Sequence, residues 1–174
     1  MSKELKALLL CAGYGTRLRP LTNAVPKCLI EINKKPILEH WLNKLEDSGF
    51  SNVLINTHYL NKQVSNFLLK RKKSKMNIEF VYEKELLGTA GTLIKNQEFF
   101  KDSKIALIHA DNMTNFKIQE LIKADTFRPK NCLLTMLTFN TENPQSCGIV
   151  VSDNDKILRE FHEKSPTPPS NVAN

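Results

Sequence analysis

The 174-residue sequence predicts a layered α/β fold in which helices cover both faces of a mainly parallel sheet. Short apolar runs rich in β-branched residues alternate along the chain with segments whose apolar residues recur at helical spacing. The first run, residues 5–12, is apolar apart from Lys6, as in strands that are buried on both faces. A composition of 41% hydrophobic and 25% charged residues is typical of one globular domain and excludes collagen-like and disordered chains.

The expected elements are bounded by residues that favour the beginning or end of a helix. Pro36 suits a first helical turn, and Gly49 ends the helix that follows. Asn61 is expected to cap the next helix, with Val64 and Phe67 on its inner side. The expected strands are 5–12, 53–56, 77–82, 105–109, 132–139, 148–151 and 157–162. The expected helices are 36–48, 61–73, 88–96 and 117–124.

Membrane and disulfide-rich classes are excluded by short apolar runs and by cysteine spacing. The longest uninterrupted apolar run, residues 7–12, is far shorter than the roughly 20 residues of a membrane span, and no signal-peptide cleavage site follows it. We therefore expect a soluble, cytoplasmic protein with no membrane partner. The four cysteines are Cys11, Cys28, Cys132 and Cys147. They form no Cys-x-x-Cys pair and mostly lie in apolar runs, which predicts buried free thiols.

The net charge of +7 is unevenly distributed. Residues 1–75 contain 14 Lys and Arg against 5 Asp and Glu, whereas residues 76–174 contain 11 against 13. The basic run 70–75 suits the solvated carboxyl end of a helix, where cations complement the helix dipole. A nucleic-acid patch is the alternative, but the run contains no aromatic residues for base stacking. We therefore expect no nucleic-acid partner.

Two glycine-containing loops are candidate ligand sites. Gly13 and Gly15 follow the first expected strand, and Gly88 and Gly91 follow the third. Glycine allows the backbone to approach a ligand closely, and open parallel sheets bind ligands beyond the carboxyl ends of their strands. Taken singly, either pair could instead form a tight turn.

The first loop has the residues of an anion site. It lacks the Lys-Ser/Thr of a Walker loop, and Leu18 replaces the third glycine of the dinucleotide fingerprint. Its free backbone N–H groups, residues 13–16, could form an anion cradle beside the cations of Arg17 and Lys27. Two cations beside such amides indicate a triphosphate.

Residues 13–27 match the pattern G-x-G-T-R-L-x-P-L-T-x-x-x-P-K, and later motifs follow in a fixed order. These are Glu83 with Leu87-Gly88-Thr89-Ala90-Gly91, Asp111, Gly148-Ile149-Val150, and Phe161-His162-Glu163-Lys164 leading to Ser170-Asn171. Over essentially its whole length the sequence resembles the sugar-phosphate nucleotidylyltransferase family. Leu-Gly-Thr-Ala-Gly is most similar to the mannose-1-phosphate guanylyltransferase branch. The resemblance implies a Rossmann-like three-layer α/β/α sandwich with a mainly parallel mixed sheet.

The resemblance also implies a reaction. A nucleoside triphosphate, expected to be GTP, condenses with a sugar 1-phosphate, expected to be mannose 1-phosphate, to give a nucleotide sugar and pyrophosphate. Because the sugar phosphate is itself the nucleophile, the protein only needs to align the groups and neutralise charge. Two alternatives stay open: the same chemistry with UTP, CTP or dTTP and a hexose or heptose 1-phosphate, and a non-catalytic nucleotide-sugar-binding relative.

Residue roles follow from the same resemblance. Arg17 would hold the β- and γ-phosphates, Lys27 would bridge the α-phosphate and the sugar phosphate, and Asp111 would bind Mg²⁺. The expected nucleotide contacts are Leu10, Ala12, Gly13, Gly15, Thr16, Arg17, Glu83, Gly88 and Thr89. The expected sugar-phosphate contacts are Lys27, Gly148, Glu163, Lys164 and Asn171. His109 shares a strand face with Asp111, so a His/Asp transition-metal site is the alternative. The remaining histidines, His40, His58 and His162, are expected to be structural or exposed.

A last expectation concerns the end of the sequence. In the family, the segment that matches residues 170–174 continues into another strand, and a second metal-binding Asp follows later. The resemblance therefore implies that residues 1–174 are a catalytic domain without its C-terminal part. We then expect Asp111 to be the only protein carboxylate for magnesium and transfer activity to be severely reduced. An unpaired sheet edge would favour a homo-oligomer.

Overall fold

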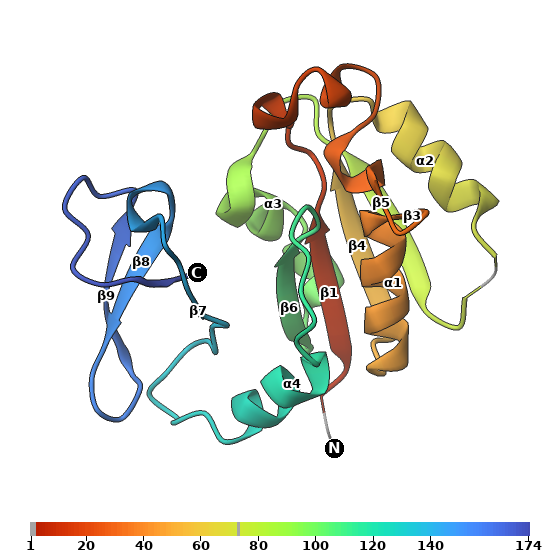
Figure 1. Cartoon of the computed structure of the whole chain (residues 1–174). Coiled ribbons are helices and arrows are strands. Elements are labelled where there is room, and N and C mark those ends of the chain that lie inside the picture. Colours follow the sequence, from red (N-terminus) through yellow and green to blue (C-terminus); the bar gives the residue numbers. More distant parts are fainter. Residues whose placement is uncertain (1–2, 73) are drawn as a thin grey trace. The chain divides into compact units, whose positions relative to one another are not determined.

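The computed structural model describes residues 3–72 and 74–174, which divide between two compact units, 1–115 and 116–174. A parallel sheet forms the centre of the first unit (Figure 1). Its strands, in spatial order, are β5 (Asn77–Tyr82), β4 (Asn52–Thr57), β1 (Leu5–Leu10) and β6 (Lys104–His109). All three pairings are parallel, so the four strands end at the same edge of the sheet. The expected parallel sheet is confirmed.

The helices of this unit agree with the sequence to within a few residues. They are α1 (Ile37–Asp47), α2 (Asn61–Lys70) and α3 (Gly88–Lys95), with the hairpin β2 (Glu31–Ile32) and β3 (Lys35–Pro36) before α1. The expected capping role of Asn61 is wrong: Leu60 occupies the N-cap position with φ 51°, and no side chain caps the helix. The helix ends at Lys70, where residue 71 becomes extended, and expected position 73 lies outside the described residues.

Apolar side chains cover both faces of the parallel sheet. Leu8 and Leu54 are buried with Phe100 in one cluster, against which Leu93 of α3 packs. Side chains alternate between faces along a strand, so the neighbours of Leu8 and Leu54 point the opposite way. Those neighbours are also buried: they are Ala7, Leu9, Val53 and Ile55. Burial on both sides explains the continuous apolar run in β1.

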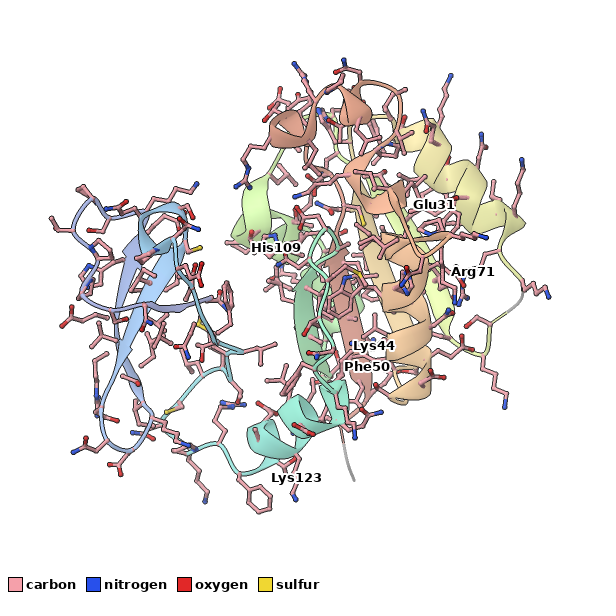
Figure 2. All side chains as sticks on the ribbon, in the orientation of Figure 1. Glu31, Lys44, Phe50, Arg71, His109 and Lys123 are labelled. Carbon is pink, nitrogen blue, oxygen red and sulfur yellow. The ribbon has the colours of Figure 1, made fainter. Side chains whose placement is uncertain are left out.

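The basic run after α2 is only partly a solvated helix end. The side chain of Arg71, labelled in Figure 2, is 9% exposed. It donates hydrogen bonds to Glu39 (3.0 Å) and Asn43 (2.9 Å) of α1, and it lies 3.5 Å from a Glu46 carboxylate oxygen. Arg71 thus joins the end of α2 to α1, because planar Arg can bind several oxygens at once. The expectation of a solvated run holds for the exposed residues Lys70, Lys72 and Lys75 but is wrong for Arg71.

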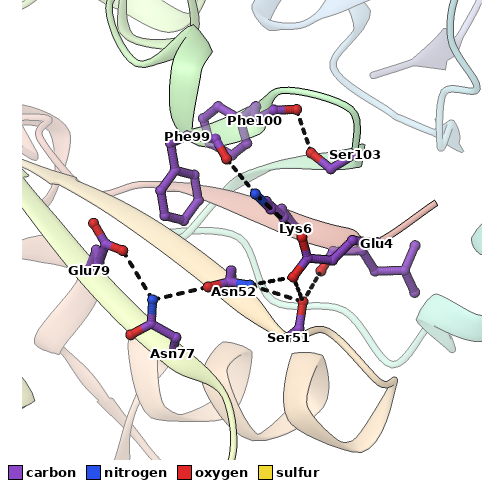
Figure 3. A network of polar contacts seen from close by, with 10 residues as sticks. Glu4, Lys6, Ser51, Asn52, Asn77, Glu79, Phe99, Phe100 and Ser103 are labelled. Carbon is purple, nitrogen blue, oxygen red and sulfur yellow. Dashed lines mark hydrogen bonds and ion pairs between the residues drawn. The ribbon is translucent and has the colours of Figure 1, made fainter.

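A polar network joins the amino ends of three strands (Figure 3). The Glu4 carboxylate accepts hydrogen bonds from the Ser51 hydroxyl and the Asn52 amide, both at 2.6 Å. Asn77 in turn donates to the Asn52 side-chain oxygen at 3.0 Å. The hydrogen bond from Ser51 is the main cause of a lowered pKa for Glu4. These contacts lie at the edge of the sheet opposite the strand ends where ligands of such sheets bind.

The second unit contains α4 (Ile118–Thr126) and an antiparallel sheet. In spatial order its strands are β7 (Phe139–Asn140), β10 (Val172–Ala173), β8 (Gly148–Ser152) and β9 (Leu158–Glu163). The turn expected between β8 and β9 is present, with the Lys156 amide donating to the Asp153 carbonyl at 3.0 Å. Asp153 also accepts hydrogen bonds from the amides of residues 155 and 157.

The expected strand over residues 132–139 is wrong for most of its length. Only Phe139 and Asn140 form a strand, and residues 132–138 are irregular. Leu133 is 94% exposed, so the apolar run is not buried in the described structure. Strand formation requires a neighbouring strand for the backbone groups, and among the described residues no strand pairs with 132–138. This also corrects the expected burial of Cys132, which is half-buried, as is Cys147.

Among the described residues, no helix is both long enough and apolar enough to cross a membrane.

Candidate phosphate-binding site

The loop after β1, residues 11–29, contains three short 3-10 helices, Thr16–Leu18, Leu21–Asn23 and Lys27–Leu29. We call it the phosphate loop, after the ligand that its sequence predicts. Gly15 lies before the first of them with φ 65°, in the left-handed region. The buried Thr22 hydroxyl donates to the Gly15 carbonyl at 2.8 Å. A Cβ on Gly15 would lie 2.9 Å from Thr22 Cγ2, so conformation and space both require glycine here.

This loop forms one wall of a pocket of about 200 Å³ at the carboxyl ends of β1 and β6. The pocket is lined by Leu10, Cys11, Gly13, Gly15, Thr16, Arg17, Leu18, Lys27, Cys28 and Asp111. The structure therefore brings together the three residues expected to hold phosphate and metal, Arg17, Lys27 and Asp111. Of the expected nucleotide contacts, Leu10, Gly13, Gly15 and Thr16 also lie on the wall, and Ala12 is buried beside them.

Parallel strand pairing explains why Asp111 reaches this loop from far along the sequence. Leu10 at the end of β1 pairs with His109 at the end of β6, and the Ala110 amide donates to the Leu10 carbonyl at 3.2 Å. Asp111 follows immediately, and its carboxylate forms an ion pair with the Lys27 ammonium. The side chains of Lys27 and Asp111 are 23% and 30% exposed, so the pair is open to the pocket.

Two cysteines line the same pocket. Cys11 follows β1, and Cys28 lies next to Lys27 in the third short helix. Both side chains are buried, as the sequence predicts. Cys28, together with burial, raises the pKa of the Cys11 thiol well above its usual value. At neutral pH Cys11 is therefore a neutral thiol.

Glu83 is held by a buried polar network and does not line the pocket. Its carboxylate accepts hydrogen bonds from the Thr92 hydroxyl at 2.6 Å and the Asn56 amide at 3.1 Å. Asn56 also accepts a hydrogen bond from the Cys11 amide at 2.8 Å, which connects Glu83 to the phosphate loop. Sequence reasoning missed Asn56 and Thr92, although a polar residue inside the apolar run 53–57 was an available signal.

Gly88 and Thr89, the other expected nucleotide contacts, begin α3. Gly88 has φ 69°, and its carbonyl oxygen lies 2.9 Å from the Thr92 hydroxyl oxygen. The same hydroxyl binds Glu83, so this loop and Glu83 are fixed by one side chain. Gly88 and Thr89 are exposed, whereas Glu83 is buried.

A second connection between the two glycine loops was not expected from the sequence. His58 Nδ1 lies 2.7 Å from the Glu83 carbonyl, an acceptor, so Nδ1 carries the proton of the neutral ring. His58 Nε2 then accepts a hydrogen bond from the Tyr14 hydroxyl at 2.9 Å. Tyr14 lies between the two glycines of the phosphate loop, so His58 joins that loop to the end of β5.

The residues expected to bind the sugar phosphate lie in the second unit. Gly148 begins β8 and pairs with Glu163 at the end of β9, and a Cβ on Gly148 would lie 2.5 Å from Phe161 Cζ. Lys164 Nζ lies 3.4 Å from a Glu163 carboxylate oxygen. The Asn171 carbonyl accepts a hydrogen bond from the Thr141 amide at 2.9 Å. The structure thus brings Gly148, Glu163 and Lys164 together.

Metal-ligating side chains are sparse. Within residues 3–72 and 74–174, no group of three or more His, Cys, Asp or Glu side chains is placed to hold a metal ion. Asp111 lines the pocket, whereas His109 is exposed at the end of β6 (Figure 2).

Sequence comparison identifies relatives over nearly the whole chain. A family model described as nucleotidyl transferase matches residues 6–174. The mannose-1-phosphate guanylyltransferase catalytic subunit beta of Drosophila pseudoobscura pseudoobscura is 34% identical over 97% of this chain and 46% of its own length. The UTP–glucose-1-phosphate uridylyltransferase of Synechocystis sp. is 30% identical over 92% of this chain and 44% of its own length. The chain thus spans about half the length of the curated relatives it matches.

Solved structures share the fold. The crystal structure of UDP-glucose pyrophosphorylase complexed with UDP-glucose matches with a TM-score of 0.81 and 18% identity, covering 99% of this chain and 74% of that one. A putative glucose-1-phosphate thymidylyltransferase from Bacillus anthracis matches with a TM-score of 0.79 and 20% identity, covering 97% and 68%. These similarities confirm the Rossmann-like α/β fold.

Proposed function

Since the chain belongs to the nucleotidyl transferase family, we propose that it binds a nucleoside triphosphate for transfer of the nucleotidyl group to a sugar 1-phosphate. The observation that supports this most directly is the convergence of Arg17, Lys27 and Asp111 on one pocket beside the backbone of residues 13–16. In the proposed reaction, a sugar-phosphate oxygen attacks the α-phosphorus, and the bond to the β-phosphate breaks. The products are a nucleotide sugar and pyrophosphate.

Each cation of the pocket has a distinct proposed task. Arg17 offers a planar fork for the β- and γ-phosphates, and backbone N–H groups of the loop add donors for the same oxygens. Lys27, a mobile point charge, would move from Asp111 to the α-phosphate and the incoming sugar phosphate. Charge at the reacting phosphorus would then be neutralised as the new bond forms.

Asp111 is the proposed protein ligand for Mg²⁺. A single carboxylate on the wall of a phosphate pocket suits magnesium, which is commonly bound by one or two carboxylates together with substrate phosphates and water. When bound there, the ion would supply charge neutralisation and fix the orientation of the triphosphate. The residues present therefore fit an ion that arrives with its nucleotide.

We further propose GTP as the nucleotide and mannose 1-phosphate as the acceptor. Support comes from the Leu-Gly-Thr-Ala-Gly segment and from guanylyltransferases 34% identical to this chain. A uridylyltransferase at 30% identity supports UTP with glucose 1-phosphate as a second candidate. For the sugar phosphate, we propose contacts with Lys27, Gly148, Glu163, Lys164 and Asn171.

Nucleotide binding by the 174-residue chain tests the proposal. We would measure dissociation constants for GTP, UTP, CTP and dTTP with Mg²⁺ by calorimetry, for the natural sequence and for Arg17→Ala and Lys27→Ala. Losing one charged contact to phosphate is worth about 1.5–3 kcal/mol, so each variant should bind roughly ten- to 100-fold more weakly. Arg19→Ala is the matched control, because Arg19 is an exposed cation of the same loop outside the pocket lining.

Two outcomes of this experiment distinguish the assignment of the phosphate site from the choice of base. Unchanged affinity in both Arg17→Ala and Lys27→Ala would remove the phosphate assignment. Tight binding of UTP with none of GTP would overturn the choice of base and leave the phosphate site intact.

A further inference from the structure

Helix α1 holds the segment that joins β6 to α4. Residues 112–117 of this segment form neither helix nor strand. Trp41 of α1 donates a hydrogen bond from Nε1 to the Asn112 carbonyl at 2.8 Å. Lys44, labelled in Figure 2, donates from Nζ to the Thr114 carbonyl at 2.6 Å. The two contacts therefore fix this irregular segment to α1 at two points.

The two donors are themselves held together on α1. Trp41 and Lys44 are three residues apart, so they are neighbours on one face of the helix. The Lys44 ammonium lies 5.8 Å from the centre of the Trp41 ring, within the range of a cation–π contact. Trp41 is only 8% exposed, and a buried indole N–H needs an acceptor, which the Asn112 carbonyl provides. Both donors thus reach the segment from a fixed place.

Asp111 lies between this segment and the parallel sheet. On its amino side, the Ala110 amide donates to the Leu10 carbonyl at 3.2 Å. On its carboxyl side, the Asn112 carbonyl is held by Trp41. The backbone is therefore fixed on both sides of Asp111, whose side chain lines the pocket. Support of this kind fixes the orientation of a metal ligand and raises its affinity for the ion.

We propose that Trp41 and Lys44 are positioning residues for Asp111: through the backbone of the segment, they hold its carboxylate where the pocket would receive the divalent cation of a metal–nucleotide complex. This inference rests on the proposed function, in which Asp111 binds Mg²⁺. Trp41 and Lys44 are not among the residues that line the pocket, so both would act through Asp111. Loss of a contact behind a metal ligand typically costs about ten- to 100-fold in metal affinity. Since Trp41 contacts the neighbour of the ligand, we expect the lower end of this range.

Calorimetry of the full 174-residue chain tests the proposal with GTP and with UTP, each in the presence and absence of Mg²⁺. The ratio of the two affinities is the gain from Mg²⁺, and in Trp41→Phe this gain should fall by about tenfold. Lys44→Met should lower it as well, and Lys44→Arg, which keeps a donor, should restore it. Affinity for nucleotide without metal should not fall, because Arg17 and Lys27 are unchanged.

Two controls separate positioning from effects of stability and charge. Leu42→Val removes a methylene group from a fully buried side chain of α1, and Lys62→Met removes an exposed ammonium from α2. Both variants should keep the full gain from Mg²⁺. If Leu42→Val loses as much of this gain as Trp41→Phe does, Trp41 only stabilises the fold and the proposal is wrong.

Trp41 also provides a spectroscopic test, because it is the only tryptophan in the sequence. Its indole N–H gives a single side-chain resonance in a proton–nitrogen correlation spectrum. Adding Mg²⁺ to the nucleotide-bound chain should shift this resonance as Asp111 exchanges Lys27 for the cation, and Asp111→Asn should abolish the shift. A resonance that stays unchanged while calorimetry shows a gain from Mg²⁺ would contradict the connection between Trp41 and Asp111.

Failure of the positioning role is distinguishable from failure of the proposed function. If Asp111→Asn removes the gain from Mg²⁺ but Trp41→Phe and Lys44→Met keep it, the positioning role is wrong and the proposed function stands. If Mg²⁺ adds nothing to nucleotide binding by the natural sequence, the proposed metal role of Asp111 fails and the positioning role fails with it.

Discussion

Replacing Gly15 by alanine combines a backbone effect with a steric one at the phosphate loop. Gly15 has φ 65°, and a non-glycine residue in this left-handed region costs roughly 1–2 kcal/mol. The new Cβ would also lie 2.9 Å from Thr22 Cγ2, so Thr22 must move. Thr22 is fully buried and donates a hydrogen bond of 2.8 Å to the Gly15 carbonyl, whose loss costs about 1 kcal/mol. We expect Gly15→Ala to lower the free energy of unfolding by about 2–3 kcal/mol.

Urea unfolding followed by circular dichroism measures this change, with two glycine variants as controls. Gly13→Ala adds a Cβ that meets nothing within 4 Å, at a φ outside the left-handed region, so its effect should stay within about 0.5 kcal/mol. Gly49→Ala has φ 83° and open space, and isolates the backbone strain. Equal urea midpoints for Gly15→Ala and Gly13→Ala would refute the reasoning.

Three further changes have expected outcomes. Thr92→Val removes a hydroxyl donor from a buried carboxylate and should destabilise the chain by about 1–3 kcal/mol in the same urea assay. Glu4 has a pKa below its ordinary value of 4.5, chiefly because Ser51 donates to it, so its stabilising effect is present above pH 4.5 and is lost as pH falls through the folded-state pKa. Glu4→Gln should accordingly reduce the loss of stability on acidification below 4.5, and equal pH profiles would contradict this. Asp111→Asn releases Lys27, so GTP without metal should bind more tightly to the variant in calorimetry, while the gain from Mg²⁺ should shrink.

The parallel sheet was predictable because each of its strands has a recognisable local sequence pattern. Residues 7–9 of β1 and 53–55 of β4 are apolar and buried on both faces, and such runs are recognisable without knowledge of their neighbours. Residues 132–138 have the same local character but form no strand in the described structure. Strand propensity records the fit of a side chain to a sheet, whereas the presence of a partner strand is a tertiary property.

The candidate site, too, was only partly predictable from the sequence. Gly13, Gly15, Arg17 and Lys27 lie within one short motif, which predicted that they line a common site, and they line one pocket. The connection from Tyr14 through His58 to Glu83 joins residues 44 and 25 positions apart, so only the folded chain reveals it. Likewise, apolar surroundings predicted two buried thiols, but their place in one pocket depends on how the loop returns to β1.

The ion pair in the pocket explains how two oppositely charged groups can serve one ligand. Lys27 and Asp111 neutralise each other, and partly exposed pairs of this kind contribute at most about 1 kcal/mol. Under the proposed function, a triphosphate with its divalent cation would offer each group a new partner, phosphate for Lys27 and the cation for Asp111. Because two charge-assisted contacts replace one weak contact, binding of the anion and of the cation should reinforce each other. A nucleotide alone must leave Asp111 without a cation, and a metal alone must leave Lys27 without an anion, so the pair favours the complete metal–nucleotide complex over either component.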